Sequence, residues 1–254
     1  MDRLVVALDG PGSSGKSSVG AAAARTLGYR FCDTGLLYRA VTWLAEARGV
    51  SVDDPTGLVD LVDVVDLAPD DAGRLARVVV DGVDHTGDVH SPAVDSAVSA
   101  VSAVPEVRAA LLARQRALAS EGGIVMAGRD IGTVVLPDAD LKIYLDASVD
   151  ERARRRAEER GLDPHGTEAA SILEALRRRD RLDTTRAVAP LRVAPDARII
   201  ATDDNTFELT VGTVVATIRD AEARRDDRAT GGATGGATGN TKGDAPGPGA
   251  PASR

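Results

Sequence analysis

Residues 10–17 read Gly-Pro-Gly-Ser-Ser-Gly-Lys-Ser, which matches the phosphate-loop pattern G-x-x-x-x-G-K-[ST]. The aliphatic run Leu4–Leu8 before the loop predicts a buried parallel strand, and the alanine-rich segment Lys16–Leu27 after it predicts a helix. Glycines let consecutive backbone N–H groups point at phosphate oxygens, and the N-terminus of the helix adds partial positive charge. The alternative is a Gly-Ser turn that only caps the helix. We interpret the segment as a nucleotide-binding loop.

The loop predicts both ATP and Mg²⁺ as ligands. The ammonium group of Lys16 suits the β- and γ-phosphates, and the hydroxyl of Ser17 suits the metal ion. The predicted ATP-binding residues are Gly10, Pro11, Gly12, Ser13, Ser14, Gly15, Lys16, Ser17 and Ser18.

Beyond the loop, short apolar runs alternate with helical patterns. The further strands are predicted at Tyr29–Cys32, Ile124–Ala127, Leu141–Leu145 and Arg198–Ala201. The further helices are predicted at Leu36–Arg48, Pro105–Ser120 and Thr206–Arg219. Five strands joined by crossover helices predict a three-layer α/β fold with a five-stranded parallel sheet and helices on both faces.

Two segments interrupt this alternation, and we expect both to lie outside the sheet. Residues 76–89 alternate in polarity and carry DG and TG turn signals, which predicts antiparallel strands within an insert at about 64–104. Residues 150–186 are rich in arginine. Residues 229–254 are rich in Gly, Ala, Thr and Pro, which predicts a disordered tail. The predicted single domain therefore spans 1–228, with its core formed by 1–63, 105–149 and 187–228.

Composition excludes several classes of protein. The 254 residues include 31 basic and 39 acidic side chains, and this net charge of −8 argues against general electrostatic binding to nucleic acid. No apolar run approaches the roughly 18 residues of a membrane span, and the N-terminus does not resemble a signal peptide. The single cysteine fits a reducing compartment, and the three histidines lie in no metal-ligand spacing. We expect a cytoplasmic protein with neither nucleic-acid nor membrane partners.

Three classes of nucleotide-binding protein remain: a small-molecule kinase, a nucleotide-gated switch and a motor-type ATPase. A guanine-specific switch needs an Asn-Lys-x-Asp base reader, but Asn205 and Asn240 are both followed by Thr. A translocating ATPase would be expected to carry basic surfaces with stacking aromatics, whereas aromatics make up 2% of this acidic chain. A kinase is favoured.

Three further motifs join the phosphate loop: Asp33-Thr-Gly-Leu-Leu-Tyr-Arg39, Gly128-Arg-Asp-Ile-Gly-Thr133 and Arg186-Ala-Val-Ala-Pro-Leu191. From Leu4 to about Arg219, the chain resembles bacterial cytidylate kinases. The resemblance implies a P-loop kinase fold in which the insert binds the nucleoside monophosphate and residues 150–186 form a lid. It also implies transfer of the γ-phosphoryl group of Mg·ATP to CMP or dCMP in pyrimidine nucleotide metabolism. The loop departs from the family in one respect, since Gly12 precedes Ser13 where relatives more often have a small residue and then Gly.

The resemblance also implies roles for individual residues. Arg39, Arg129 and Arg186 bind the acceptor's phosphate, for which guanidinium forks are suited. The implied CMP-binding residues are Asp33, Thr34, Tyr38, Arg39, Ser99, Arg108, Arg129, Asp130, Asp183 and Arg186, with Ser99, Arg108 and Asp130 on the base and Asp183 on the ribose. The implied catalytic residues are Lys16, Arg129, Arg155 and Arg179.

Some of these residues have a simpler explanation. Ser99 lies in a segment rich in small residues, and Asp183 has the spacing of an i,i+4 partner of Arg179. Thr34 would also suit a turn cap, and Tyr38 a packing aromatic. In the arginine-rich segment, Arg152, Arg156 and Arg160 form one helical stripe, with Arg155 beside it.

Two alternative functions stay open. One is a P-loop kinase for another acceptor, such as UMP, AMP or a small metabolite. The other is a nucleotide-binding regulator that has kept the loop and lost phosphoryl transfer. No sequence feature indicates an obligate partner, and we expect a monomer.

Overall fold

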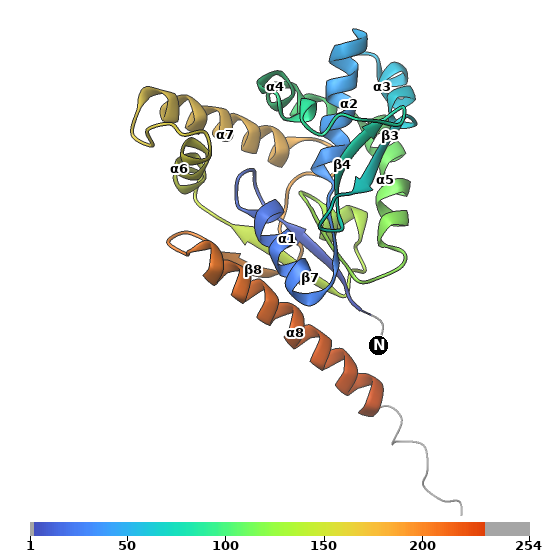
Figure 1. Ribbon diagram of the computed structural model, residues 1–254, viewed down its shortest axis with the longest axis vertical. Helices are drawn as coiled ribbons and strands as arrows, with labels where there is room; N and C mark the ends of the chain where they lie inside the picture. The colour runs from blue at the N-terminus through green and yellow to red at the C-terminus, as the bar shows by residue number, and fades with distance from the viewer. Residues whose placement is uncertain (1–2, 232–254) are drawn as a thin grey trace, which may run out of the picture.

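The central feature of the molecule is a single mixed sheet. The computed structural model describes residues 3–231 (Figure 1). Within them eight strands form this sheet, in the order β3-β4-β2-β6-β1-β7-β8 with β5 paired to β4. The strands are β1 (Val5–Asp9), β2 (Arg30–Asp33), β3 (Val65–Pro69), β4 (Arg74–Val80), β5 (Val83–Asp84), β6 (Ile124–Gly128), β7 (Leu141–Asp146) and β8 (Arg198–Ala201). The strands β2, β6, β1, β7 and β8 run parallel, which confirms the predicted five-stranded parallel sheet.

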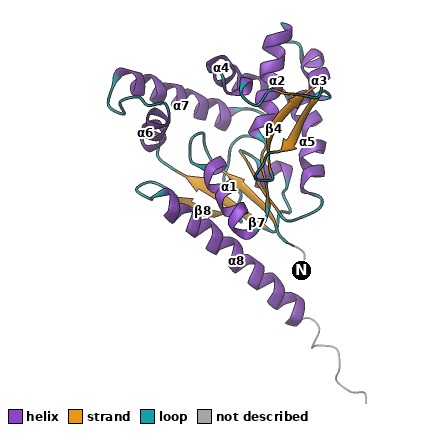
Figure 2. Cartoon of the chain, in the orientation of Figure 1, coloured by secondary structure: helices purple, strands orange, loops and turns teal. Residues whose placement is uncertain are grey.

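Helices connect the strands and cover both faces (Figure 2). They are α1 (Lys16–Leu27), α2 (Gly35–Arg48), α3 (Pro55–Val62), α4 (Pro92–Val101), α5 (Pro105–Ala119), α6 (Val149–Glu159), α7 (Thr167–Thr185) and α8 (Phe207–Gly231), with the short turns η1 (Asp88–His90) and η2 (Ile131–Val135). Helix α1 has the predicted bounds. It ends at Gly28, whose φ of 68° suits glycine and lets its N–H group contact the carbonyls of Ala24 and Arg25.

The alternation of side chains along β1 separates the two faces of the sheet. Val6 and Leu8 pack in one cluster with residues of α1 and α8, whereas Ala7 packs on the opposite face with residues of α5 and η2. Successive residues of a strand point to opposite faces, so a continuous aliphatic run is buried on both sides. This is the three-layer arrangement that the sequence predicts.

The expectation that the insert lies outside the sheet was wrong. Strand β4 pairs in antiparallel fashion with β3 and β5, as the turn signals predict, but its first residues also pair in parallel with β2, with Arg74 opposite Phe31 and Leu75 opposite Cys32. Without β4, the backbone groups on this edge of β2 would lack partners, and pairing satisfies them. The insert is thereby attached to the core beside the segment that follows β2.

The arginine-rich segment forms the packed helices α6 and α7 outside the sheet, as expected. Their shared apolar cluster includes Ala157, Ile172 and Leu176. Helix α8 extends to Gly231, twelve residues past its predicted end, and so includes the first three residues of the predicted tail. The rest of the predicted tail, 232–254, lies outside the described residues.

Among residues 3–231, no single helix is long and apolar enough to cross a membrane. Helices α4 and α5 satisfy that criterion only when they are taken together, and the chain bends by 97° between them.

Replacement of Tyr29 by phenylalanine should lower the free energy of unfolding by about 1–2 kcal/mol. The Tyr29 hydroxyl donates to Glu222 Oε1 of α8 at 2.6 Å and accepts from the backbone N–H of Leu4 at 3.0 Å, so it joins the last helix to the start of β1. Burial and the bond to Glu222 raise the pKa of Tyr29 to about 12. Urea unfolding of the two proteins tests this, with Thr26→Val, which removes an exposed hydroxyl of α1, as a control. Equal stability of Y29F and the parent would contradict the proposed bond.

Candidate active site

The carboxyl ends of three neighbouring strands bring the sequence motifs together. Asp9, before the phosphate loop, lies opposite Gly128 of β6, and Asp33 of β2 lies opposite Ala127. Because these strands run parallel, the segments that follow them emerge at one edge of the sheet. The phosphate loop, the start of α2 and Arg129 therefore surround one space, although they are up to 119 residues apart.

This space is a cleft of about 380 Å³ between the phosphate loop, the insert and the helical pair α6–α7. In the described part of the chain, seven of its lining side chains are Lys or Arg and four are Asp or Glu. The basic residues are Lys16, Arg39, Arg108, Arg129, Arg156, Arg179 and Arg186, and the acidic ones are Asp33, Asp130, Glu159 and Asp183. A protein with a net charge of −8 thus concentrates positive charge in one cleft, which suits an anionic ligand.

The phosphate loop is closed around its lysine. Lys16 Nζ donates to the carbonyl of Pro11 at 2.6 Å and lies 3.5 Å from Ser14 Oγ. Gly10 has a φ of 152°, and a Cβ atom there would lie 2.2 Å from the carbonyl oxygen of Leu145, so only glycine fits. Ser13 has a φ of 60°, in the region that non-glycine residues rarely adopt. The reversed Gly12-Ser13 order is therefore accommodated at some cost in strain.

Three cations of the cleft are close enough to repel one another. Burial, followed by the charge of Arg129, lowers the pKa of Lys16 well below its ordinary value. Burial and Arg129 likewise lower the pKa of Arg179 to about 10. Among the described residues, the buried Nε atom of Arg179 has no hydrogen-bond partner. A polyanion would relieve this repulsion and supply the missing acceptor.

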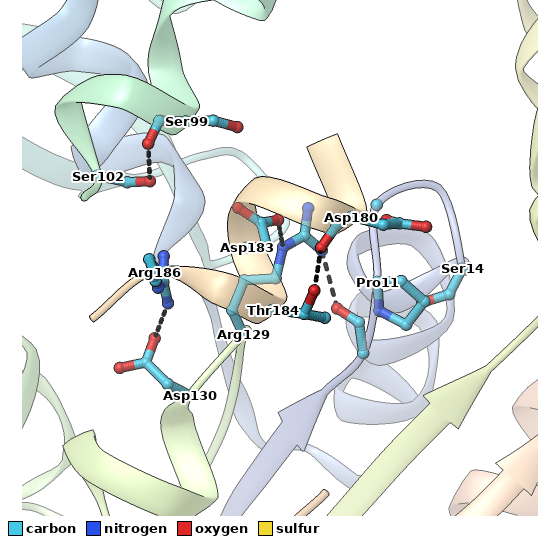
Figure 3. A network of polar contacts seen from close by, with 12 residues as sticks. Pro11, Ser14, Ser99, Ser102, Arg129, Asp130, Asp180, Asp183, Thr184 and Arg186 are labelled. Atoms are coloured by element: carbon cyan, nitrogen blue, oxygen red, sulfur yellow. Dashed lines mark hydrogen bonds and ion pairs between the residues drawn. The ribbon is translucent and has the colours of Figure 1, made fainter. Parts of the chain in front are cut away.

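Arg129 links the phosphate loop to α7. Its Nε donates to Asp183 Oδ2 at 2.8 Å (Figure 3). Its Nη1 donates to the carbonyl of Gly10 at 2.8 Å. Asp183 thus pairs with Arg129 rather than with its i,i+4 neighbour Arg179. The guanidinium group is fixed on both sides while still lining the cleft.

A second group of side chains surrounds Asp130. This carboxylate, 4% exposed, accepts from Arg108 through Oδ2 and from Arg186 Nη2 through Oδ1 at 3.3 Å (Figure 3). Arg108 also lies 5.4 Å from the centre of the Tyr38 ring, a cation–π contact. Burial lowers the pKa of Arg186 and raises that of Tyr38. Segments far apart in the sequence thus form one polar pocket, in which the Asp130 carboxylate pairs with the guanidinium groups of Arg108 and Arg186.

Between the two groups, the end of β2 and the start of α1 provide oxygen atoms. The Ser17 hydroxyl donates to Asp33 Oδ2, and the other oxygen of Asp33 accepts from the N–H group of Gly35 at 3.0 Å. The Thr34 hydroxyl donates to the carbonyl of Ala127 at 2.9 Å, so it holds β2 against β6 as well as lining the cleft.

Five of the predicted site residues do not line the cleft: Gly10, Pro11, Ser14, Ser99 and Arg155. Gly10, Pro11 and Ser14 form the inner wall of the phosphate loop. Ser99 is buried in α4, and its carbonyl accepts from the Ser102 hydroxyl. Arg155 turns away to the segment after β8, where Nη1 donates to Thr202 Oγ1 at 3.0 Å, and Nε donates to Glu151 at 2.7 Å. Its placement next to a transferred phosphoryl group is therefore not supported by this geometry.

Four polar side chains of the cleft were not predicted from the sequence: His90, Ser102, Arg156 and Glu159. The other lining residues that were not predicted are Gly35, Leu36, Val98 and Gly128. Arg156 lies on the predicted stripe with Arg152 and Arg160, and this helical spacing was the available signal. Ser102 lies one turn after Ser99 in the same small-residue segment, so the pattern could not rank one above the other. His90 lies in a short turn and carries no spacing signal.

Sequence comparisons with known proteins agree on one family. The family model described as cytidylate kinase matches residues 6–220. A cytidylate kinase of Pelotomaculum thermopropionicum is 47% identical over 215 residues, covering 84% of this chain and 95% of that protein. One from Rhodococcus opacus is 45% identical, covering 85% and 94%. A solved shikimate kinase from Bacteroides thetaiotaomicron aligns at 14% identity with a TM-score of 0.43, covering 84% of this chain and 97% of that chain.

Proposed function

This chain belongs to the cytidylate kinase family, and on that premise we propose that its cleft transfers the γ-phosphoryl group of ATP to CMP or dCMP, giving ADP and CDP or dCDP. The observation that carries the proposal is the surplus of cations in the cleft of an acidic protein, with the pKa values of Lys16 and Arg179 lowered by burial and by Arg129. Two phosphorylated ligands bring the negative charge that this cluster lacks.

The donor ATP takes the side of the phosphate loop. Residues 10–18 place consecutive backbone N–H groups at the start of α1, which suits the β- and γ-phosphates. Lys16 then exchanges the carbonyl of Pro11 for phosphate oxygens, so its buried charge gains anionic partners. Arg129 and Arg179 contact the transferred group from the other side.

The acceptor takes the side of the insert. Arg39, Arg129 and Arg186 bind its phosphate, and Asp183 binds the ribose. On the base, Asp130 accepts from the 4-amino group of cytosine while Arg108 donates to the ring, and Tyr38 packs beside Arg108. Uracil presents an oxygen in place of the amino group, so it offers Asp130 no hydrogen-bond donor and sets one acceptor against another.

Chemistry in this cleft needs positioning and charge stabilisation rather than a general base. The second pKa of a phosphate monoester is about 6, so the attacking oxygen is mostly deprotonated near neutral pH. Fixed guanidinium groups stabilise the charge on the transferring phosphoryl group without reorganisation. Closure of α6–α7 over the cleft excludes water that would otherwise hydrolyse ATP.

We assign Mg²⁺ to the position between Ser17 and Asp33. Their hydroxyl and carboxylate oxygens already contact each other, and Mg²⁺ prefers oxygen ligands from one or two carboxylates together with substrate phosphates and water. Within the described residues, no group of three His, Cys, Asp or Glu side chains could hold a metal without such phosphates. When bound, the ion neutralises phosphate charge.

We further propose that the protein acts in the cytoplasm as a monomer in pyrimidine nucleotide metabolism. Its single cysteine, Cys32, is buried and has no second cysteine in the chain with which to form a disulfide, which fits a reducing compartment.

A coupled assay with Mg·ATP and CMP, dCMP, UMP or AMP tests the function. CMP and dCMP should be phosphorylated efficiently, and kcat/KM for UMP should be lower by about 10⁴, because only cytosine pairs with the Asp130 carboxylate. Rapid phosphorylation of AMP or UMP without phosphorylation of CMP would identify another acceptor. Binding of ATP without transfer to any acceptor would identify a regulator.

A further inference from the structure

One carboxylate at the mouth of the cleft joins three distant elements. Asp95 of α4 accepts from Arg39 Nη2 of α2 through Oδ1, at 2.6 Å. Its other oxygen, Oδ2, accepts from Arg156 Nη2 of α6 at 3.1 Å and from Nη2 of Arg160, the residue directly after α6, at 3.2 Å. Within residues 3–231, both hydrogen bonds that connect the insert (64–104) with the pair α6–α7 end on Asp95.

The environment of Asp95 favours a charged, ordered carboxylate. Its side chain is 19% exposed, and that of Arg39 is 14% exposed, so water screens their ion pair only partly. Burial acts to raise the pKa of Asp95, but the hydrogen bond and charge of Arg39 and the charge of Arg156 outweigh it and hold that pKa below its ordinary value. The carboxylate is therefore ionised at neutral pH and compensates several guanidinium groups.

Arg39 and Arg156 both line the cleft, and without a shared anion they would repel each other. Arg39 is further held by the carbonyl of Val89, which accepts from its Nη1 at 3.1 Å. Arg156 has a second partner in Glu159 of its own helix, at 3.2 Å, which cannot tie α6 to the insert. Asp95 is thus the group that brings the arginine of the lid next to the arginine of the acceptor side.

We propose that Asp95 is a positioning residue that locks α6 of the lid to the acceptor insert, and so sets Arg39 and Arg156 for the incoming phosphate groups. The role in transfer rests on the proposed function, whereas the lock itself exists without substrate. Asp95 does not contact the substrate. It lets the two arginines share a small space before phosphate arrives, so less rearrangement is needed when the cleft fills.

Spin labels test the lock in the protein without any nucleotide. Ala100 of α4 and Ala170 of α7 are exposed and lie outside the Asp95 network, and the native Cys32 is buried, so A100C and A170C can be labelled selectively. The parent should give a narrow distance distribution in pulsed electron paramagnetic resonance. Asp95→Asn should broaden it and move it to longer distances. An unchanged distribution overturns the lock.

A matched control comes from the same insert. Asp81 pairs with Arg48 at 2.7 Å on an exposed surface, so Asp81→Asn makes the same chemical change away from the cleft. This variant should keep the parental distribution and kinetics. If D81N broadens the distribution as much as D95N does, the effect belongs to the charge of the insert and the proposal fails.

Kinetics test the positioning role. Asp95→Asn should lower kcat for CMP about ten-fold, as expected for the loss of hydrogen bonds to charged groups. Arg160 does not line the cleft, so Arg160→Gln removes one of the two lid contacts to Asp95 and leaves that of Arg156 in place. It should lower kcat in the same direction but by less than D95N, and Arg160→Lys should largely reverse the loss. The double variant D95N/R160Q should be no slower than D95N. If the losses of kcat in D95N and R160Q add up in the double variant, the proposal is contradicted. A parent protein that does not phosphorylate CMP would refute the proposed function, and the spin-label distances would still decide whether the lock exists.

Discussion

Replacement of Lys16 by alanine should abolish phosphoryl transfer, lowering kcat by about a thousand-fold or more. Its ammonium group is the cation at the start of α1 inside the phosphate loop, where it donates to the carbonyl of Pro11 at 2.6 Å. Burial and the charge of Arg129 make the charge of Lys16 unfavourable in the absence of a polyanion. The interaction of Lys16 with the phosphates of ATP is therefore strongly favourable. The coupled assay with saturating CMP and Mg·ATP measures the loss.

The same variant should not be less stable than the parent. A lysine whose pKa is lowered on folding opposes folding at neutral pH, because its charge is more favourable in the unfolded chain. Urea unfolding should therefore give K16A an equal or higher free energy of unfolding. Lys142→Ala is the control for the assay, since Lys142 pairs with Asp196 at 2.9 Å and lies outside the cleft. If K16A transfers phosphoryl groups at a rate close to that of the parent, Lys16 of the phosphate loop takes no part in the transfer.

Replacement of Arg129 by alanine should lower kcat/KM for CMP by about 10³-fold. Arg129 is the side chain that joins donor and acceptor halves of the cleft, because it contacts Gly10 of the phosphate loop and Asp183 of α7. Its loss removes a fixed cation from the transferring group and frees the Asp183 carboxylate next to the substrate. Arg129→Lys should recover only part of the rate, because an ammonium group cannot reproduce both contacts of the guanidinium fork.

Steady-state kinetics with varied CMP measure the effect. Arg177→Ala is the matched control: Arg177 lies on α7 but pairs with Glu174 at the exposed surface, at 2.8 Å, so its removal should leave kcat/KM unchanged. Normal CMP kinetics in R129A would show that the clamp on the acceptor's phosphate is wrongly assigned.

Much of the fold could be predicted because the decisive signals are local. The burial of Val6, Ala7 and Leu8 on both faces of the sheet follows from an uninterrupted aliphatic run. The phosphate loop depends on glycines and a lysine within eight consecutive positions, and a short loop has few conformations that present its N–H groups to one anion. The extension of α8 to Gly231 was missed, since the apolar pattern fades after Arg219 while Tyr29 and Glu222 hold the helix to the sheet.

The pairing of the insert with the core sheet could not be predicted from local sequence signals. Turn residues predicted the antiparallel ribbon, but nothing in residues 74–80 indicates that β4 also pairs with β2. That pairing depends on which strand of the sheet has a free edge, which is a property of the order of all the strands. It matters for function, because it fixes the insert next to the segment that carries Thr34, Tyr38 and Arg39.

The lid shows the same limit at the level of single side chains. Arg155 and Arg156 are adjacent, and on a helix they point in directions about 100° apart. One donates to Thr202 outside the cleft, and the other lines the cleft and bonds Asp95. The sequence identifies the stripe of Arg152, Arg156 and Arg160, but the packing of α6 against α7 decides which side faces the phosphate loop.

By itself, the sequence determined the five-stranded parallel core, the phosphate loop and the motifs that carry Arg39, Arg129 and Asp130, because each is encoded in a few consecutive residues. Only the tertiary structure decided how these cations meet. It paired Arg129 with Asp183, held Asp130 between Arg108 and Arg186, and joined Asp95 of the insert to the arginines of the lid. Such contacts join residues 22 to 65 positions apart, and their geometry follows from strand order and helix packing, which no local pattern encodes.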